Sequence, residues 1–552
     1  MAGAVARLFR VTARPSLSVA LPARVWRIVA LAVTIAGALA IAGTYFTFSN
    51  TFDEPAHLAA GMQRLAMGRY DYDAQRPPLG RIAAAVGPYL HGGRSVGASS
   101  AYDEGARLLG HGAHYRTTLA LARLGELPFF LLLCGVLWAW ARQLTDDRGG
   151  AIAVALAASN PNLLAHAGLA TTDIALAATI TASLFAFVLW LDAPRWTHSL
   201  ALGIALGLSA TTDYASLAML ALAFPAVYLT RRHATGRAPI WPDNAGRRAS
   251  LALGAVFAAA AITGWGVYGF HTGPLIEGSR VVVPAPEWFR GFASYVTAPS
   301  PARPAFLFGE RSASGWWYYY LVALLVKSPL PLLLVAILGA AAAMRDLVRR
   351  FGWQLAAPLA ATAAIILAAA FVGDDAGIRL VLPVFALLAL LGTAAIVELW
   401  EHSATRVPAR RLVRAVVAAT LVAVAVVPMR AHPDYLAYFN PIAGDRPELI
   451  LVDSNLDWGQ DLYRLDMVMR RMRIDSVSVA YYGSASFDAA GVRHARSLAA
   501  AERPTGWIAA SQTMLAGVGG DGAYEWLNEL QPVGRVGASL VLYYVPPRRV
   551  RR

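Results

Sequence analysis

The chain has 552 residues, of which 57% are hydrophobic and 15% are charged, and its mean hydropathy is +0.48. Soluble domains carry roughly a quarter charged residues, so this composition excludes a soluble globular protein and indicates a polytopic membrane protein. The formal net charge of +14 does not indicate nucleic-acid binding, because the arginines lie between apolar runs and no soluble basic domain is present. The single cysteine, Cys134, excludes a disulfide framework.

Apolar runs predict about eleven transmembrane helices. The expected spans are 28–48, 121–141, 150–165, 173–191, 199–212, 214–230, 250–270, 316–343, 353–372, 380–399 and 412–428. The first run follows several arginines, as in a signal peptide, but it is long enough to span, so we interpret it as an uncleaved helix.

Arginines fall in alternate connectors between these spans, which predicts a cytoplasmic N-terminus. Three regions then lie outside the cytoplasm, namely 49–120, 271–315 and everything after about 430. We therefore divide the chain into a transmembrane domain, 1–429, and an extracytoplasmic domain, 430–552.

The composition changes in this last region. Strand-like runs alternate there with helix-like pieces, which predicts a small α/β domain. The expected strands are 476–482, 507–511 and 538–545, and the expected helices are 462–471 and 524–530.

The first outer loop begins with an acidic pair, Asp53 and Glu54, five residues after span 28–48 is complete. A carboxylate pair costs free energy near hydrocarbon, so it marks a functional site or is well solvated. His57 follows one turn later, and Gln75 and Arg76 return to the same surface before a second short interfacial helix. A structural alternative for Asp53 is capping of the helix that Pro55 begins.

Three more polar clusters lie at span ends on the outer side. They include His166 and Asp173, then Glu310, Tyr318 and Lys327, and finally Asp374, Asp375 and Arg379. The predicted topology brings these clusters together at one side of the membrane. Simpler roles stay open for several of them: Asp173 suits a helix N-cap, Arg76 and Arg379 suit membrane anchoring, and Tyr318 suits an aromatic belt.

An extracytoplasmic site lacking a nucleotide-binding motif suits a lipid-phosphate-linked sugar as the activated donor. Its phosphate leaves as a stabilised anion, so one carboxylate base and cations suffice. Asp53 is the candidate base, and Arg76, Arg379 and Lys327 are candidates for binding the phosphate. The reaction requires no cofactor, although a divalent cation between Asp53 and Asp173 is conceivable.

Several motifs resemble the GT-C-type glycosyltransferases that use polyprenyl-phosphate sugars, the superfamily of protein O-mannosyltransferases and lipid A aminoarabinose transferases. The matching elements are Asp53-Glu54, Arg76-Pro77-Pro78, Ala170-Thr-Thr-Asp173, the run from Gly309 to Pro329, Arg379-x-x-Leu-Pro383 and 453–461. The resemblance implies transfer with inversion, with Asp53, Glu54 and Asp173 as catalytic residues. It gives weaker substrate-binding roles to His57, Gln75, His166, Glu310 and Tyr318. Gln75, Arg76 and Asp213 depart from the family pattern, which bears on the sugar and the acceptor.

The resemblance further implies a bacterial inner membrane, a polyprenyl-phosphate sugar donor and an acceptor that is protein, lipid or glycan. A transporter or flippase of a lipid-linked saccharide is the main alternative. Transporters bind substrate near the bilayer midplane and carry inverted repeats, whereas these polar residues lie at span ends and no repeat is evident. A scaffold without catalytic activity, binding envelope partners through its outer domain, is a third alternative.

Overall fold

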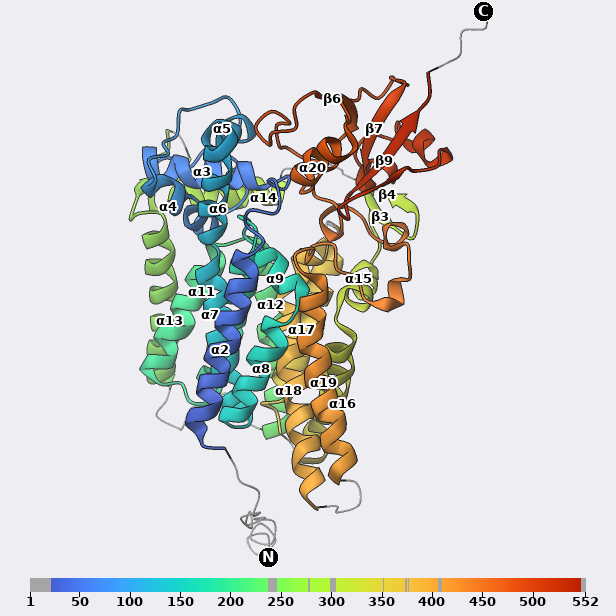
Figure 1. Cartoon of the computed structure of the whole chain (residues 1–552). Coiled ribbons are helices and arrows are strands. Elements are labelled where there is room, and N and C mark those ends of the chain that lie inside the picture. Colours follow the sequence, from blue (N-terminus) through green and yellow to red (C-terminus); the bar gives the residue numbers. More distant parts are fainter. Residues whose placement is uncertain are drawn as a thin grey trace, which may run out of the picture.

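The computed structural model describes residues 21–236, 246–276, 278–297, 304–350, 352–372, 375, 377–405 and 410–547. Long helices form an upright bundle, and short helices and a small sheet cover one end of it (Figure 1). The first described helix, α2 (Ala23–Ala42), starts at the uncovered end, and the last described strand, β9 (Leu540–Val545), lies at the covered end (Figure 1).

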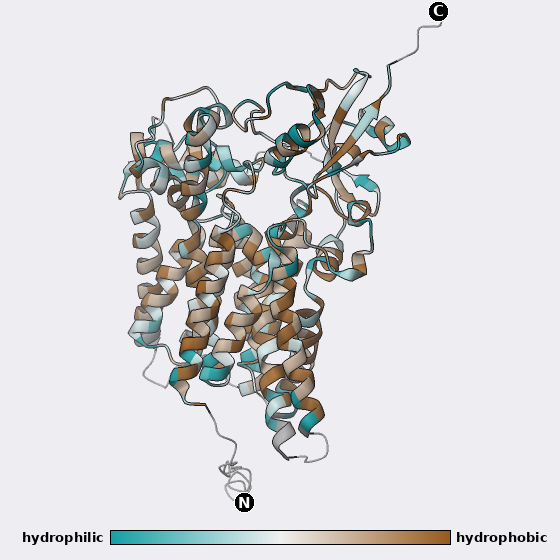
Figure 2. Ribbon diagram, viewed as in Figure 1, coloured by the Kyte–Doolittle hydropathy of each residue, from teal (hydrophilic) through white to brown (hydrophobic). Residues whose placement is uncertain are grey.

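Apolar residues predominate along the bundle, and polar residues gather at its two ends (Figure 2). The bundle helices are α2 (Ala23–Ala42), α7 (Leu127–Leu144), α8 (Asp147–Ala158), α10 (Asp173–Asp192), α11 (Trp196–Ala210), α12 (Ala215–Thr235), α13 (Gly246–Val267), α16 (Leu330–Arg350), α17 (Ala356–Val372), α18 (Leu382–Thr405) and α19 (Arg410–Ala431). Among the described residues, 7 helical stretches are long and apolar enough to cross a membrane. The polytopic α-helical class is therefore confirmed, whereas the number eleven stays a prediction.

Helix α18 forms the centre of the bundle. Within the most apolar stretch of α18, 89% of the residues are buried by the rest of the protein. In α19 the corresponding share is 11%, so most of its surface is left for lipid. The sequence of α18 is apolar on all sides, as expected for a helix surrounded by others.

Two predicted spans are interrupted. The run 316–343 forms α15 (Tyr319–Lys327) and α16, because Ser328 is extended, with ψ 137°, before Pro329. The run 150–165 forms α8 and α9 (Pro161–Ala167), with Asn160 extended before Pro161. Both breaks have one cause: proline disfavours the helical conformation of the residue before it. The expectation of single continuous helices was wrong at these two places.

Most of the first outer loop folds into short helices on top of the bundle (Figure 1). They are α3 (Glu54–Met67), α4 (Leu79–Leu90), α5 (Ala101–Leu109) and α6 (Gly112–Leu124). The second large loop contributes α14 (Pro286–Thr297) and the hairpins β1–β2 (Thr272–Pro274, Val282–Pro284) and β3–β4 (Ala305–Leu307, Glu310–Ser312). Helices α3 and α4 pack backbone to backbone at Gly61, where a Cβ atom would lie 1.8 Å from the carbonyl oxygen of Arg81.

The last part of the described chain contains a five-stranded sheet of order β6-β5-β7-β9-β8. Its strands are β5 (Val477–Ala480), β6 (Ala495–Ser497), β7 (Gly506–Ser511), β8 (Gly534–Val536) and β9 (Leu540–Val545), with α20 (Leu462–Met472) before them. Strand β5 pairs parallel to β6 and β7, and β9 pairs antiparallel to β7 and β8. The small α/β region is confirmed; the predicted helix 524–530 is the 3₁₀ helix η5 (Glu525–Glu529), and the short edge strands β6 and β8 were missed.

The segment between α19 and α20 holds the sheet region against the bundle. The Nζ atom of Lys327 donates to the carbonyl oxygens of Leu436, at 2.8 Å, and Asn455, at 2.6 Å. The side-chain amide of Asn440 donates to the carbonyl oxygens of Leu325 and Ser328. The break between α15 and α16 is thus one place where the carboxyl-terminal region attaches.

Candidate active site

A small cleft opens at the covered end of the bundle, with a volume of about 50 Å³. Its polar lining consists of Arg76, Asp173, Asp213, Tyr295 and Tyr320, and its apolar lining consists of Ala215, Ala218, Met219, Ala368, Ala369 and Leu380. The apolar wall comes from α12, α17 and the 3₁₀ helix η1 (Ile378–Val381). The outer region 271–315 contributes Tyr295 through α14. Charged groups therefore meet an apolar surface between two bundle helices.

Asp53 pairs with Arg379 at the end of the bundle that holds this cleft. One carboxylate oxygen lies 3.1 Å from Nη1 of Arg379, and the two side chains are 15% and 9% exposed. Asp53 precedes α3, but its side chain makes no capping hydrogen bond, so the structural alternative does not account for it. The guanidinium of Arg379 also lies 4.6 Å from the ring centroid of Trp458, a cation–π contact that fixes its plane.

Arg76 provides a second cation in the cleft. Within the described chain, no hydrogen bond or ion pair engages its guanidinium; only its backbone is held, by the Tyr70 hydroxyl donating to its carbonyl oxygen at 2.6 Å. Burial alone would lower the pKa of Arg76, but the nearby carboxylates of Asp213 and Asp53 raise it. The guanidinium therefore stays charged and open to an anion.

Asp173 begins α10 and lies in a buried hydrogen-bonded group. One oxygen accepts from the Thr171 hydroxyl, at 2.7 Å, and lies 3.1 Å from Nδ1 of His166. The His166 ring lies 6.4 Å from that of Trp458, between centroids. Trp458 thus contacts both His166 and Arg379, a connection that the sequence analysis missed.

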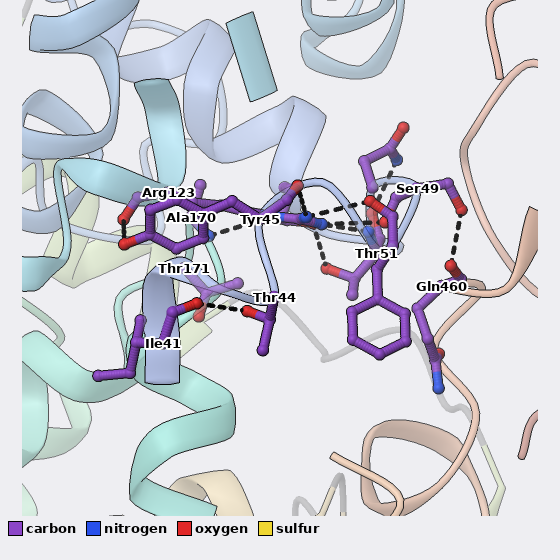
Figure 3. Close-up of polar contacts among 12 residues, drawn as sticks. Ile41, Thr44, Tyr45, Ser49, Thr51, Arg123, Ala170, Thr171 and Gln460 are labelled. Atoms are coloured by element: carbon purple, nitrogen blue, oxygen red, sulfur yellow. Dashed lines mark hydrogen bonds and ion pairs between the residues drawn. The ribbon is translucent and has the colours of Figure 1, made fainter. Parts of the chain in front are cut away.

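Glu54 is buried beside Asp53 and is fully engaged with other parts of the chain. Its oxygens accept from Arg123, at 2.8 and 2.9 Å, from the backbone of Ala170, at 2.9 Å, and from that of Thr51, at 2.7 Å. Burial alone would raise the pKa of Glu54, but Arg123 and the backbone donors lower it. Figure 3 shows Arg123, Ala170 and Thr51 in this network, next to Ser49, whose amide donates to the carbonyl oxygen of Gln460 at 3.1 Å. In the structure Glu54 fixes the backbone that carries Asp53.

His57 is also buried, at 2% exposure, and its Nδ1 accepts from Nε of Arg81 at 3.1 Å. Burial and the Arg81 charge lower the pKa of His57 to about 3, so the imidazole is neutral. Arg81 also pairs with Asp73 and donates to the Tyr70 hydroxyl. His57 thus supports the packing of α3 on α4 rather than a ligand.

The other predicted site residues lie in different settings. Gln75 is exposed and donates to Ser294 on α14 at 3.4 Å. Glu310 is exposed on the β3–β4 hairpin, and Tyr318 is partly buried before α15. Lys327 is buried in the attachment described above, and its phosphate contact stays a prediction. Asp374 lies outside the described residues, and Asp375 accepts from the amide of Trp316 at 2.7 Å.

The described residues contain no group of three or more His, Cys, Asp and Glu side chains able to hold a metal ion. Asp53 instead faces Arg379, and Asp173 faces His166 and Thr171. These partners engage Oδ2 of each carboxylate, and a divalent cation between the two residues stays a prediction.

The fold and the cleft define a polytopic membrane protein whose charged site lies where the bundle meets its outer layer. Residues 118–242 match the family model described as dolichyl-phosphate-mannose-protein mannosyltransferase. The resemblance to GT-C glycosyltransferases is confirmed over this segment, which includes Asp173 and Asp213. No curated protein sequence matches the chain.

Two solved proteins resemble the chain over most of its length. The crystal structure of ArnT from Cupriavidus metallidurans bound to undecaprenyl phosphate is 14% identical, with a TM-score of 0.49, covering 93% of this chain and 97% of that one. The oligosaccharyltransferase of Archaeoglobus fulgidus, in its complex with zinc and sulfate, is 12% identical, with a TM-score of 0.48, covering 94% and 74%.

Proposed function

We propose that this chain transfers a sugar from a polyprenyl-phosphate donor to an acceptor outside the cytoplasm, with inversion at the anomeric carbon. The observation that carries the proposal is the open guanidinium of Arg76, which lines a cleft whose opposite lining is apolar. A partly buried arginine whose guanidinium makes no hydrogen bond or ion pair within the described chain suits a phosphate, and an apolar wall between two bundle helices suits the lipid chain attached to it.

Asp53 acts as the general base in this proposal. It takes the proton of the acceptor hydroxyl while the acceptor oxygen bonds to the anomeric carbon. The bond from that carbon to the phosphate oxygen breaks, and the phosphate leaves with the electron pair. Proton transfer to a positioned carboxylate contributes typically about 10²–10⁴-fold to such a rate.

Arg379 links the base to the leaving group. Arg379 pairs with Asp53 in the structure, and its positive charge also acts at the position of Arg76. A phosphate bound at Arg76 is therefore attracted by both guanidinium groups. As the bond to the phosphate breaks, charge grows on the phosphate oxygens, so two fixed arginines stabilise the transition state more than the ground state.

Glu54 and Lys327 have positioning roles in this proposal. Glu54 and Arg123 hold the turn that presents Asp53, and Lys327 holds the segment that leads to Trp458 above Arg379. We place the chain in a bacterial inner membrane, with the N-terminus in the cytoplasm and the region after α19 outside. The arginine distribution and the family resemblance support this placement.

The test supplies membranes containing the protein with polyprenyl-phosphate mannose labelled in the sugar, and follows the label. Transfer of label from the lipid to an acceptor supports the proposal. Label that stays on the lipid and only changes leaflet supports a flippase instead and overturns it. Membranes lacking the protein are the control for other transferases.

A further inference from the structure

Asp213 lies on the turn between α11 and α12 and lines the cleft beside Arg76 and Asp173. Only one of its carboxylate oxygens is engaged in the described structure: Oδ1 accepts from the amide of Ala215 at 2.9 Å. The residue is 9% exposed and lines the cleft, so the second oxygen is available to a ligand that enters there. An acceptor without a protein partner in a cleft favours a ligand that brings a hydrogen-bond donor.

The turn that carries Asp213 is fixed from two sides. The amide of Leu79 donates to the carbonyl oxygen of Thr211 at 2.8 Å, which ties the turn to the first outer loop. The Tyr214 hydroxyl donates to the carbonyl oxygen of Trp288, and the Trp288 indole donates to that of Ala210, both at 2.8 Å. The carboxylate is therefore preorganised, and little entropy is lost when it accepts a hydrogen bond.

Because Asp213 lies beside Arg76, its position determines which part of the sugar-phosphate substrate it contacts. In the proposed function Arg76 holds the phosphate, and the sugar is attached directly to that phosphate. The hydroxyl on the carbon next to the anomeric carbon is the nearest donor that the sugar offers to a neighbouring carboxylate. Hydrogen bonds to this hydroxyl strengthen as a glycosyl transition state develops.

We infer that Asp213 determines donor specificity by accepting a hydrogen bond from this hydroxyl. The inference rests on the proposed function and adds the substrate class: a sugar whose hydroxyl beside the phosphate-bearing carbon is free. A 2-deoxy donor leaves the buried oxygen unpaired, and sites built to bind a hydroxyl reject analogues that lack it.

The experiment measures binding to the purified full-length protein in detergent by calorimetry. The probes are geranyl phosphate, geranyl-phosphate mannose, geranyl-phosphate glucose, and the 2-deoxy sugar that both share. Mannose and glucose present the hydroxyl in its two orientations. The proteins are wild type, Asp213→Asn, Asp213→Ala and the control Asp192→Asn, which changes an exposed acid at the far end of α10.

We expect wild type and Asp192→Asn to bind one of the two hydroxyl-bearing donors at least about tenfold more tightly than the 2-deoxy donor, the range for a hydrogen bond to a charged group. Both Asp213 variants should lose this preference and keep their affinity for geranyl phosphate, or gain some, because a negative charge beside Arg76 is gone. The asparagine variant retains an acceptor for the Ala215 amide, and the thermal midpoint of each variant checks its folding.

Equal binding of the deoxy and hydroxyl-bearing donors by wild type overturns the inference, as does an undiminished preference in a folded Asp213→Asn protein. Either result leaves the proposed function intact, provided that geranyl phosphate binds. A wild-type protein that does not bind geranyl phosphate contradicts the proposed function itself, so the two failures are distinct.

Discussion

The carboxylate of Asp53 lies 3.1 Å from the guanidinium of Arg379, 326 positions away along the chain. The contact joins the first outer loop to the short helix before α18, and Trp458 covers it from the carboxyl-terminal region. Three distant parts of the sequence thus meet at one ion pair. The candidate site is formed only when the outer loop, the bundle and the carboxyl-terminal region are all in place.

Arg76 is expected to provide much of the affinity for a lipid phosphate. Arg76→Ala should weaken the binding of undecaprenyl phosphate by about ten- to a hundredfold, the range for a charge-assisted hydrogen bond. Titration of the detergent-solubilised protein measures this affinity. Arg69→Ala is the matched control, because Arg69 pairs with Asp71 at the exposed surface of the same loop. Equal affinity in wild type and Arg76→Ala contradicts the assignment.

Lys327 is expected to affect stability without affecting the phosphate. Lys327→Met keeps the length of the side chain but leaves the carbonyl oxygens of Leu436 and Asn455 without their donor. Because unsatisfied buried acceptors each cost about 1–3 kcal/mol, the thermal midpoint should fall. Undecaprenyl phosphate should bind a folded Lys327→Met protein as wild type does. A large loss of that affinity, with an unchanged midpoint, restores Lys327 as a phosphate ligand.

Glu54 and Arg123 are expected to act as one structural unit. Removing one partner of a buried ion pair leaves the other charge uncompensated and costs about 3–5 kcal/mol. Glu54→Gln and Arg123→Gln should therefore lower the thermal midpoint similarly, and the double variant should lose less than the sum of the two. A Glu54→Gln protein of wild-type stability that has lost all transfer activity would instead identify Glu54 as a catalytic residue.

Asp457 makes stability depend on pH. Burial raises the pKa of this carboxyl to about 7 from 3.8, although the Thr513 and Gly459 donors oppose the shift. The folded protein then holds a proton that the unfolded chain releases, so the stabilisation is complete below about pH 4 and is lost as the pH rises through 7. At 1.4 kcal/mol per unit, this single group changes the unfolding free energy by on the order of 4 kcal/mol.

Thermal midpoints of wild type and Asp457→Asn between pH 5 and 8 measure this contribution. The variant has no titrating group at the position, so its midpoint should fall less over that range than that of wild type. Parallel profiles of the two proteins would show that Asp457 does not titrate there.

The sequence indicated the residues of the candidate site more completely than the residues that hold them in place. Asp53, Arg76, Asp173 and Arg379 stand at span ends beside Pro or Thr signals, and the structure brings them to one end of the bundle. The backbone carbonyl partners of Lys327 lie 109 and 128 residues away along the chain, so no local pattern reveals them.

Other features had signals that were available in the sequence. Pro329 and Pro161 mark the two helix breaks that the span assignment passed over. Asp213 was noted only as a departure from a family pattern, although an acid at the end of a span deserves the same weight as Asp173. Arg81 offered no signal, because an arginine in a polar loop is usually solvated. Arg123 lies inside the predicted span 121–141, where a charge indicates a buried partner, and the structure pairs it with Glu54.

The central claim is that Asp53 is the catalytic base. The most direct measurement compares the envelope glycans and lipids of strains with wild-type protein, Asp53→Asn and the surface control Asp71→Asn, by mass spectrometry at matched protein abundance. The account predicts that a mass corresponding to one sugar is present in wild type and Asp71→Asn and absent in Asp53→Asn. An unchanged glycan and lipid profile in an abundant Asp53→Asn protein, under conditions where the wild-type product is detected, would contradict it.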